Sequence, residues 1–391
     1  MSAFYTSDVL DFFGELTPAE QSALGRLREV LTASVKPHVA EYWEAGEFPE
    51  QILEPLISLN MMNPSEVVES GESPSGLFAG FRNLELARTD VSTATFYNAV
   101  SGLFRTTVLL GGSEEQVRAW DPGIVDFSFT GAFSLTEPDH GSDIARGIST
   151  TAHRDGDHWV LNGSKRWIGG CSHVDNLAIF AAGEEPGEVF GFIVPKETEG
   201  ITLNKIQGKT ALRMMQNFDI EIQNVRVSEE FRLQRINTFT DVSGLLRNMR
   251  SDVAWIATGG QMGAYEAALE YATTREQFGK PIASFQLIQE KLATMLANIT
   301  ASLCMVVRLT QQQDSGIFVD ANSALAKRFC AARFRETAAL AREIVGGNGI
   351  LLDHDVARFH ADAEAVYSYE GTDQINALVV GRSITGINAF K

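Results

Sequence analysis

The sequence has few cysteines, no long uninterrupted apolar run and fewer basic than acidic residues. Its three cysteines, Cys171, Cys304 and Cys330, are far apart and form no CxxC pair, so the spacing indicates neither a disulfide framework nor a metal site. No apolar stretch approaches the length that spans a membrane. With 32 basic against 50 acidic residues, the net charge of -18 argues against nucleic acid or an anionic membrane as the main partner.

The two ends of the chain lack recognisable targeting signals. The opening "MSAFYTSDVLDFFGEL" is acidic and has neither a charged n-region nor a long apolar run, so we expect no secretory signal and no arginine-rich transit peptide. The final "NAFK" is not a peroxisomal address. We therefore expect a cytoplasmic protein. Its 391 residues and 44% apolar share predict two or three domains with a large buried core.

The periodicity of apolar residues divides the chain into three regions. Residues 1–128 have a helical pattern, which begins with a capping box at Thr17 to Glu20 and continues on one helical face from Leu24 to Val35. Residues 129–236 change to a period of two, and "NFDIEIQNVRV" alternates strictly. Here Asp155-Gly156 and Asn162-Gly163 are typical of hairpin turns. From 237 to 391 the helical period returns, as in a bundle.

Two stretches near the start of the β region contain candidate ligand contacts. In "FSLTEPDHGSD", residues 133 to 143, backbone N–H groups and the hydroxyls of Thr136 and Ser142 could meet a planar heterocycle or a phosphate. The alternative is a loop that joins two domains. In "NGSKRWIGG", residues 162 to 170, Trp167 could stack on a ring system, or it could be ordinary core.

Two stretches of the last region could contact an anionic ligand. Arg275, in "REQFGKPIASFQLIQEKLA", could clamp a pyrophosphate bidentately, or it could cap a helix. In "EIVGGNGI", Gly346 and Gly347 would let the backbone pass close to a ligand, although glycine after a helix is usually a C-cap.

The stretch "SYEGTDQI", residues 368 to 375, contains the best candidate for acid–base chemistry. Burial against apolar and aromatic neighbours raises the pKa of a carboxylic acid. With such a pKa, Glu370 could take a proton from carbon. The alternative is a surface glutamate at the start of a helix.

In their order along the chain, these stretches resemble the acyl-CoA dehydrogenase family of flavoproteins. Its sequence blocks are similar to "LTEPDHGSD", "LNGSKRWI", "REQFGKP", "VGGNGI" and "YEGTDQI". The segments "NKIQGKTALRMMQN" and "GRSITGINAF" resemble the glutaryl-CoA dehydrogenase branch and the plant short-chain acyl-CoA oxidases. The resemblance extends from about residue 15 to the C-terminus. It implies an α+β multidomain fold with an N-terminal helical domain (1–128), a central β-barrel (129–236) and a C-terminal four-helix bundle (237–391).

The resemblance also implies a homotetramer that binds FAD where two subunits meet. The residues that match the contacts of a subunit with its own flavin are Phe133, Leu135, Thr136, Ser142, Trp167, Ile168 and Gly169. Those that match contacts with the FAD of a neighbouring subunit are Arg275, Phe278, Gln286, Glu343, Gly346 and Gly347. Thr372 and Gln374 would also touch the cofactor.

By the same resemblance, Glu370 is the base that removes the α-proton of an acyl thioester. The Glu370 N–H and a flavin ribityl hydroxyl would stabilise the developing enolate, while the β-hydrogen leaves as hydride to flavin N5 and gives a trans-2-enoyl thioester. Arg250, in "NMRSDVAW", would hold Glu370 or the thioester, and Ser142 and Gly371 would contact the substrate.

Two departures from the family pattern limit what the resemblance implies. Gly169 stands where the dehydrogenases usually have threonine. The plant oxidases also lack this threonine. The chain could thus pass electrons to an electron-transfer flavoprotein or, as an oxidase, to O2. Ala94 stands where glutaryl-CoA dehydrogenases have the arginine that binds the distal carboxylate. We therefore expect an uncharged short-chain or branched acyl group near Ala94, Phe96 and Tyr97.

The sequence leaves open the acyl carrier and the class of reaction. The default carrier is coenzyme A, but relatives in biosynthetic pathways act on acyl carrier proteins. Flavin monooxygenases and nitroalkane-oxidising enzymes share the scaffold but generally lack a glutamate at the position of Glu370. A non-catalytic flavin-binding scaffold would not need this base.

Overall fold

The computed structural model describes residues 4–389, which form two compact units. Unit 1 contains residues 4–95, 210–214 and 250–389, and unit 2 contains residues 96–209 and 215–249. The first and last helical regions of the sequence thus belong largely to one unit, whereas the strands of the middle region belong to the other.

Unit 1 begins with short helices. The first, α1 (Pro18–Val30), starts at the expected capping box: Thr17 Oγ1 accepts a hydrogen bond from Glu20 N (3.3 Å), and Glu20 Oε2 accepts one from Thr17 N (3.1 Å). This prediction is confirmed. The following helices are α2 (Val39–Ala45), α3 (Glu50–Ser58), α4 (Ser65–Glu69), α5 (Gly76–Thr89) and α6 (Val91–Asn98), whose last three residues belong to unit 2.

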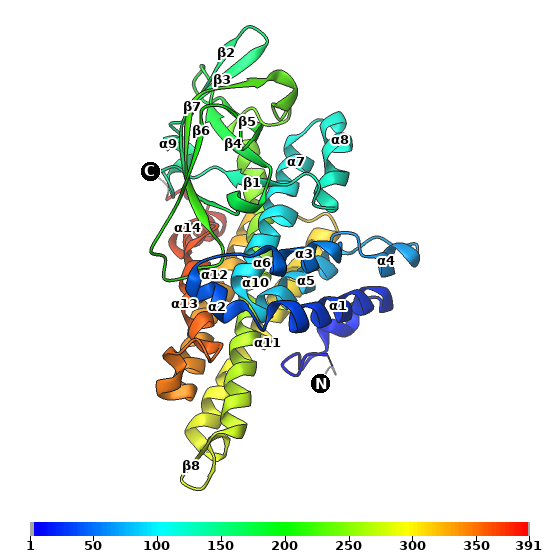
Figure 1. Cartoon of the computed structure of the whole chain (residues 1–391), viewed down its shortest axis with the longest axis vertical. Helices are drawn as coiled ribbons and strands as arrows, with labels where there is room; N and C mark the ends of the chain where they lie inside the picture. The colour runs from blue at the N-terminus through cyan, green and yellow to red at the C-terminus, as the bar shows by residue number, and fades with distance from the viewer. Residues whose placement is uncertain (1–3, 390–391) are drawn as a thin grey trace. The chain divides into compact units, whose positions relative to one another are not determined.

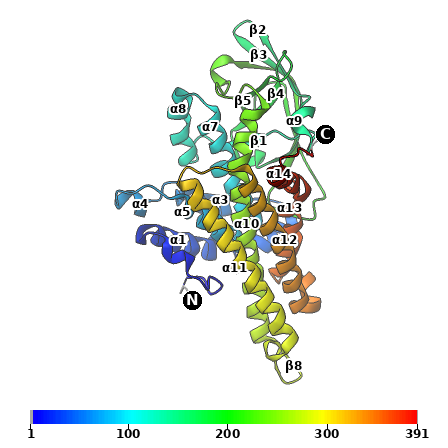
Figure 2. The ribbon, with the colours of Figure 1, turned by 180° about the vertical axis from the view of Figure 1, so that it is seen from behind.

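Long helices form the rest of unit 1. They are α10 (Phe239–Thr274, in unit 1 from residue 250), α11 (Gln286–Asp314), α12 (Asp320–Val345), α13 (Val356–Ser368) and α14 (Asp373–Thr385). Helix α11 packs on α12 and α5, and α12 packs on α13 and α14 (Figure 2). A Cβ at Gly259 would lie 2.2 Å from Leu84 O, so glycine lets α10 approach the backbone of α5. The expected C-terminal helical bundle is confirmed.

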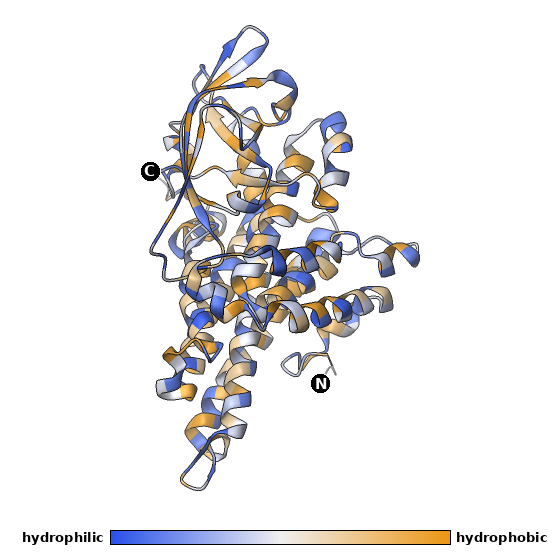
Figure 3. Cartoon of the chain, viewed as in Figure 1, coloured by the Kyte–Doolittle hydropathy of each residue, from blue (hydrophilic) through white to orange (hydrophobic). Residues whose placement is uncertain are grey.

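By length and composition alone, α11 could cross a membrane, a property that was not expected from the sequence. Half of its most apolar window is buried inside the protein, and the core helix of a soluble protein has the same property. Figure 3 shows hydrophobic and hydrophilic residues mixed along the helices of unit 1. On α11 the apolar residues Met295, Ile299, Leu303 and Val306 are buried, and their spacing of three and four is that of a helix packed on one face.

Unit 2 contains a seven-stranded sheet in the order β1-β4-β2-β3-β7-β6, with β5 paired to β4 (Figure 1). The strands are β1 (Gly131–Ser134), β2 (Thr151–Asp155), β3 (His158–Gly169), β4 (Asn176–Ala182), β5 (Val189–Pro195), β6 (Ile201–Lys205) and β7 (Asn217–Ser228). The helices are α7 (Arg105–Gly111), α8 (Glu114–Val125) and α9 (Ile144–Gly147). The expected central β domain is confirmed in the form of a half-barrel sheet.

One of the two expected hairpin turns is wrong. Asp155-Gly156 does join β2 to β3, and Gly156 has φ 68°. Asn162-Gly163 instead lies inside β3, at a shift in its register with β7. The side chain of Asn162 accepts a hydrogen bond from Asn224 N (2.8 Å). A Cβ at Gly163 would lie 2.6 Å from Thr150 Cα, so this glycine makes a bulge possible instead of a turn.

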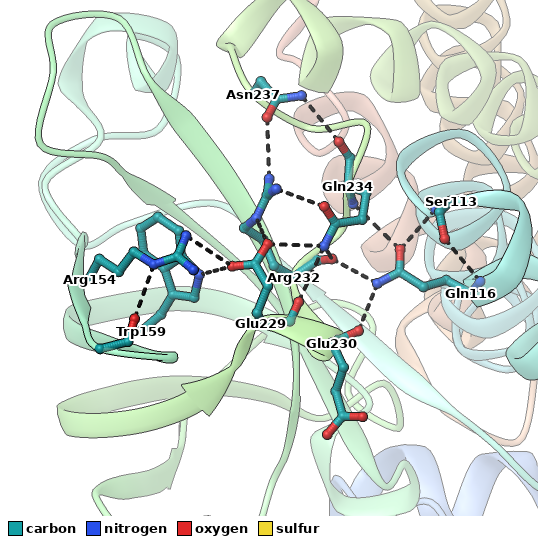
Figure 4. A network of polar contacts seen from close by, with 10 residues as sticks. Ser113, Gln116, Arg154, Trp159, Glu229, Glu230, Arg232, Gln234 and Asn237 are labelled. Atoms are coloured by element: carbon teal, nitrogen blue, oxygen red, sulfur yellow. Dashed lines mark hydrogen bonds and ion pairs between the residues drawn. The ribbon is translucent and has the colours of Figure 1, made fainter.

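A polar network fixes the segment that follows β7 (Figure 4). Glu229 accepts hydrogen bonds from Trp159 Nε1 (2.6 Å) on β3 and from Arg232 Nε (2.9 Å). Gln116 Nε2, on α8, donates to the carbonyl oxygens of Glu230 (2.8 Å) and Arg232 (2.7 Å). These contacts tie the chain between β7 and α10 to the sheet and to α8.

A buried ion pair holds the loop after β1 against β3. Lys165 Nζ lies 2.8 Å from Glu137 Oε1, and both side chains are buried. Glu137 also accepts hydrogen bonds from Ser149 N (2.7 Å) and Thr150 N (2.9 Å). Burial alone would raise the pKa of Glu137, but Lys165 and these donors lower it to about 2. Burial lowers the pKa of Lys165 to about 8, so the pair is charged at neutral pH.

We predict that Lys165→Met lowers the free energy of unfolding by about 3–5 kcal/mol, because it leaves the Glu137 carboxylate buried without its cation. Chemical denaturation at pH 7 measures the loss. The matched control is Arg226→Met, because Arg226 pairs with Asp155 on the same sheet and both side chains are more than half exposed. It should cost less than about 1 kcal/mol. Equal losses in the two variants would contradict the prediction.

Candidate active site

Glu370 lies in the turn between α13 and α14 of unit 1. Helix α13 ends at Ser368, where Tyr369 N donates to Ala365 O (3.0 Å). The next two residues both have left-handed backbones, with φ 52° at Glu370 and 84° at Gly371. This conformation suits glycine but costs a glutamate roughly 1–2 kcal/mol. Strain of this kind persists only where the surrounding structure enforces it, and it concentrates at functional sites.

The first turn of α14 holds one side of this base turn, which we define as residues 369–372. Thr372 caps α14, because its Oγ1 accepts a hydrogen bond from Ile375 N (3.2 Å). The buried Asn376 reaches back from α14, and its Nδ2 donates to the carbonyl oxygens of Gly371 (2.8 Å) and Thr372 (3.2 Å). The helix that follows the turn therefore fixes the exit from Glu370.

Lys327 on α12 holds the other side. Its Nζ donates to the carbonyl oxygens of Tyr367 (3.0 Å) and Gly371 (2.8 Å), one before Glu370 in sequence and one after it. The side chain is fully buried, with 0% exposure. No motif in the sequence pointed to this residue.

The charges around Glu370 set its protonation. Burial raises the pKa of its carboxyl, and the positive charges of Arg250 and Lys327 lower it without cancelling that rise. The raised pKa expected from the sequence is confirmed. The expected surroundings were apolar and aromatic with Arg250 nearby, and the structure adds Lys327 as a second cation.

Asp252 is a further charged group that acts on this site from within unit 1. Burial raises the pKa of Asp252 to about 7, with Arg82 opposing and Glu370 reinforcing the rise. Arg250, on α10 like Asp252, interacts with Glu370 and Asp320, and its Nε has no hydrogen-bond partner among the described residues. The arrangement combines a carboxyl that can take up a proton with a partly buried guanidinium that retains a free donor.

In unit 2, Trp167 presents a flat aromatic surface. It lies at the second register shift of β3, has φ 64°, and is 52% exposed. Its carbonyl accepts a hydrogen bond from Asn217 Nδ2 (3.0 Å), and the Arg166 guanidinium lies 5.1 Å from its ring. An indole held this firmly with half of its surface exposed is suited to stacking on a planar ligand.

The other residues expected to contact the flavin of their own subunit differ in accessibility. Thr136 is partly exposed and Ser142 is exposed. Leu135 and Ile168 are buried in the core of unit 2, so only their main-chain atoms could meet a ligand. Phe133 packs against the ring of Phe180 at a centroid distance of 5.0 Å.

Gly169 ends β3, where it pairs with Asn217. A Cβ at this position would lie 2.4 Å from the terminal methyl of Met215. A threonine here would therefore require Met215 to move.

The residues expected to reach a neighbouring subunit's FAD lie on the surface of unit 1. Arg275, Phe278, Gly346 and Gly347 line one pocket of about 500 Å³. Phe278 lies in the turn between β8 (Glu276–Gln277) and β9 (Lys280–Pro281) and is 92% exposed. The remaining residues of this set lie outside the pocket lining: Gln286 begins α11, and Glu343 pairs with Lys291 (2.9 Å). Thr372 and Gln374, the other expected cofactor contacts, are the N-cap of α14 and a residue of its first turn.

The expected acyl-pocket residues fall in both units. Ala94 is in unit 1 with 0% exposure, and it offers no charge to an acyl group. In unit 2, Phe96 packs edge-on against His173 with ring centroids 5.9 Å apart, and Tyr97 packs against Phe127 at 5.3 Å.

Sequence reasoning missed Lys327, Asp252 and Arg82. A signal for Lys327 was present: it shares a helical face with the buried Ala324, Cys330 and Phe334. A lysine on the apolar face of a helix needs a buried partner, which marks it for attention.

Comparisons with known proteins agree with this arrangement. The chain matches the N-terminal, middle and C-terminal domains of acyl-CoA dehydrogenases over residues 17–128, 132–225 and 239–385. It is 30% identical to 3-(aryl)acrylate reductase from Clostridium sporogenes over 91% of this chain and 96% of that protein. It is 31% identical to a subunit of the caffeyl-CoA reductase–Etf complex from Acetobacterium woodii, over 87% and 91%.

Solved structures give the same result. Glutaryl-CoA dehydrogenase from Mycobacterium smegmatis is 32% identical with a TM-score of 0.90, over 99% of this chain and 100% of that one. Butyryl-CoA dehydrogenase from Megasphaera elsdenii is 28% identical with a TM-score of 0.89, over 94% and 98%. Because the three domain matches together span most of the sequence, the chain belongs to the acyl-CoA dehydrogenase family of FAD-dependent oxidoreductases.

Proposed function

We propose that the protein dehydrogenates an uncharged short-chain or branched acyl thioester to the trans-2-enoyl thioester, with Glu370 as the base. The observation that supports this most is the environment of Glu370. Its carboxyl has a raised pKa because of burial, is partly accessible from outside the protein, and accepts no hydrogen bond from the described residues. A carboxylate that is partly desolvated and has no direct partner is a stronger base than one in water, as abstraction from carbon requires.

The backbone of Glu370 supports the same role. Among the described residues, no acceptor meets its N–H group, although the neighbouring groups of the turn are hydrogen-bonded. This N–H belongs to a partly buried residue, so it is available as a donor to a ligand. A thioester carbonyl bound there would be stabilised as negative charge develops on its oxygen. Arg250 would hold the carboxylate or the thioester, and Gly371 would leave space for the substrate beside the base.

The residues present fit FAD. The exposed indole of Trp167 suits the flavin ring, with Thr136 and Ser142 near the cofactor, and Ser142 also near the substrate. The pocket beside Arg275 and the two glycines suits the phosphates and adenine of a second FAD. When bound, FAD supplies the acceptor for the substrate's β-hydrogen. In the proposed homotetramer, the almost fully exposed Phe278 beside Arg275 would be covered by a second subunit.

An oxidase is the second candidate, and Gly169 is the observation that favours it. The hydroxyl usual in the dehydrogenases is missing, and Met215 fills the space beside the glycine. For a dehydrogenase we propose an electron-transfer flavoprotein as the electron acceptor, and a caffeyl-CoA reductase relative is named as part of a complex with Etf. We propose a cytoplasmic location and coenzyme A as the carrier, with an acyl carrier protein as the alternative.

Anaerobic mixing of the purified holoenzyme with short, branched and medium acyl-CoAs tests this function. Loss of the 450 nm flavin absorbance with one class is expected, and that class is then the substrate group. When air is admitted, slow recolouring indicates a dehydrogenase, whereas fast recolouring with peroxide indicates an oxidase. The same panel carried on acyl carrier protein tests the carrier. If no thioester on either carrier bleaches the flavin, the proposed function is wrong.

We predict that Glu370→Gln keeps FAD but slows flavin reduction by about 10²–10⁴-fold, the usual contribution of a general base. The raised pKa of Glu370 destabilises the folded protein at high pH. Above the ordinary pKa of a glutamate, ionisation of this carboxyl stabilises the unfolded chain more than the folded one. The variant removes that effect, so its melting temperature at pH 8 should not be lower than that of the wild type. The control is Glu364→Gln, an exposed glutamate of α13 that should change neither property. Wild-type rates in Glu370→Gln would remove Glu370 from the mechanism.

We predict that the enzyme prefers pentanoyl-CoA to glutaryl-CoA, which has an acyl chain of the same length. The buried Ala94 provides no cation, and leaving a carboxylate unpaired costs about 3 kcal/mol or more, or roughly a hundredfold in kcat/KM. Steady-state rates with an artificial electron acceptor measure the ratio. Faster turnover of glutaryl-CoA would show that another residue binds its carboxylate.

A further inference from the structure

We propose that Lys327 is a positioning residue for the base: it clamps the carbonyl groups on both sides of Glu370 and places a positive charge beside its carboxylate. This inference rests on the proposed role of Glu370 in proton abstraction. It adds a residue on a third helix, α12, to the two helices whose ends form the base turn.

The two hydrogen bonds of Lys327 constrain the base turn. Tyr367 O is among the last carbonyl groups of α13, which have no partner within the helix. A cation at this end also interacts favourably with the helix dipole. Gly371 O lies beyond Glu370, so one ammonium group bonds to main-chain atoms on both sides of the base. With Asn376 on the same carbonyl, this clamp holds Glu370 in its left-handed conformation.

A structural role alone does not require a charge at this position. A neutral amide could donate to two carbonyl groups without the cost of burying an ammonium. Burial lowers the pKa of Lys327 only to about 8, because Glu370 and Asp373 act against it. Within the described residues, no carboxylate lies within 4 Å of Lys327 as an ion pair, and Asp373 already pairs with Arg328 (3.0 Å). Glu370 is therefore the unpaired carboxylate with which the charge of this buried lysine interacts.

The charge determines the pH at which the base is ready. A cation near Glu370 favours its carboxylate form, so removing that cation raises the pKa of Glu370. Flavin reduction, which requires the carboxylate, would then begin at higher pH. The ionisable groups that interact with this pair are Arg250 and Asp252 on α10, Asp373 on α14 and Tyr369 in the base turn.

The test uses three FAD-loaded variants: Lys327→Met, Lys327→Gln and Lys327→Arg. The first removes both the charge and the donors, the second keeps a donor without the charge, and the third keeps both. We measure the rate of anaerobic flavin reduction from pH 5 to 9 with an acyl-CoA that reduces the wild type. The control is Lys36→Met, an exposed lysine of unit 1 that should leave the profile unchanged.

In the two neutral variants, the acid limb, which is the rise of the flavin-reduction rate on the acidic side of the profile, should move to higher pH. The expected shift is about one pH unit or more, the usual effect of a neighbouring charge. Lys327→Arg should return the limb toward the wild-type position. Slower reduction in Lys327→Met and Lys327→Gln with an unshifted limb would leave only a structural role and overturn the proposal. Should Lys327→Met fail to fold, the comparison of Lys327→Gln with Lys327→Arg decides alone. If the wild type is not reduced by any thioester, the proposed function fails instead.

Discussion

The arrangement of the site depends on the burial of one carboxyl group at Glu370. Burial raises its pKa and makes it a stronger base, but a fully isolated carboxylate would remain protonated and inactive at neutral pH. Arg250 and Lys327 oppose the rise without forming a direct ion pair with it. Their distance matters, since a cation in contact would pair with the carboxylate and lower its basicity. The surrounding helices therefore set the pKa of Glu370 by two opposing effects: desolvation raises it, and the two cations lower it.

The same physical problem has a different solution in unit 2. Glu137 and Lys165 are also buried, but they touch at 2.8 Å, and Ser149 and Thr150 satisfy the remaining acceptor sites of the carboxylate. The pKa of Glu137 accordingly falls to about 2, whereas that of Glu370 rises. A directly paired carboxylate holds a loop in place, whereas a carboxylate without direct partners can react. Contact geometry separates the structural glutamate from the proposed base.

Local patterns predicted much of the fold, and motifs predicted the candidates of the site. The capping box at Thr17 and the alternation in β7 depend on neighbouring residues, so they can be read directly from the chain. The hairpin turn predicted at Asn162-Gly163 was wrong because bulges and hairpin turns favour the same residues. Only the pairing of this segment with β7 distinguishes the two. Lys327 is 43 positions before Glu370, and its partners are main-chain carbonyl groups. Every residue has such a group, so the sequence does not indicate which ones a lysine will contact. Contacts of this kind depend on how α12, α13 and α14 pack together.

Hydrogen exchange at the α-carbon tests the central claim most directly, because it reports proton abstraction separately from oxidation. The holoenzyme is incubated without oxygen in D2O with the acyl-CoA that reduces its flavin, and mass spectrometry follows deuterium in the recovered thioester. The account predicts exchange with the wild-type enzyme and almost none with Glu370→Gln, although both hold FAD. Equal exchange by the two proteins would contradict it and assign the base to another group.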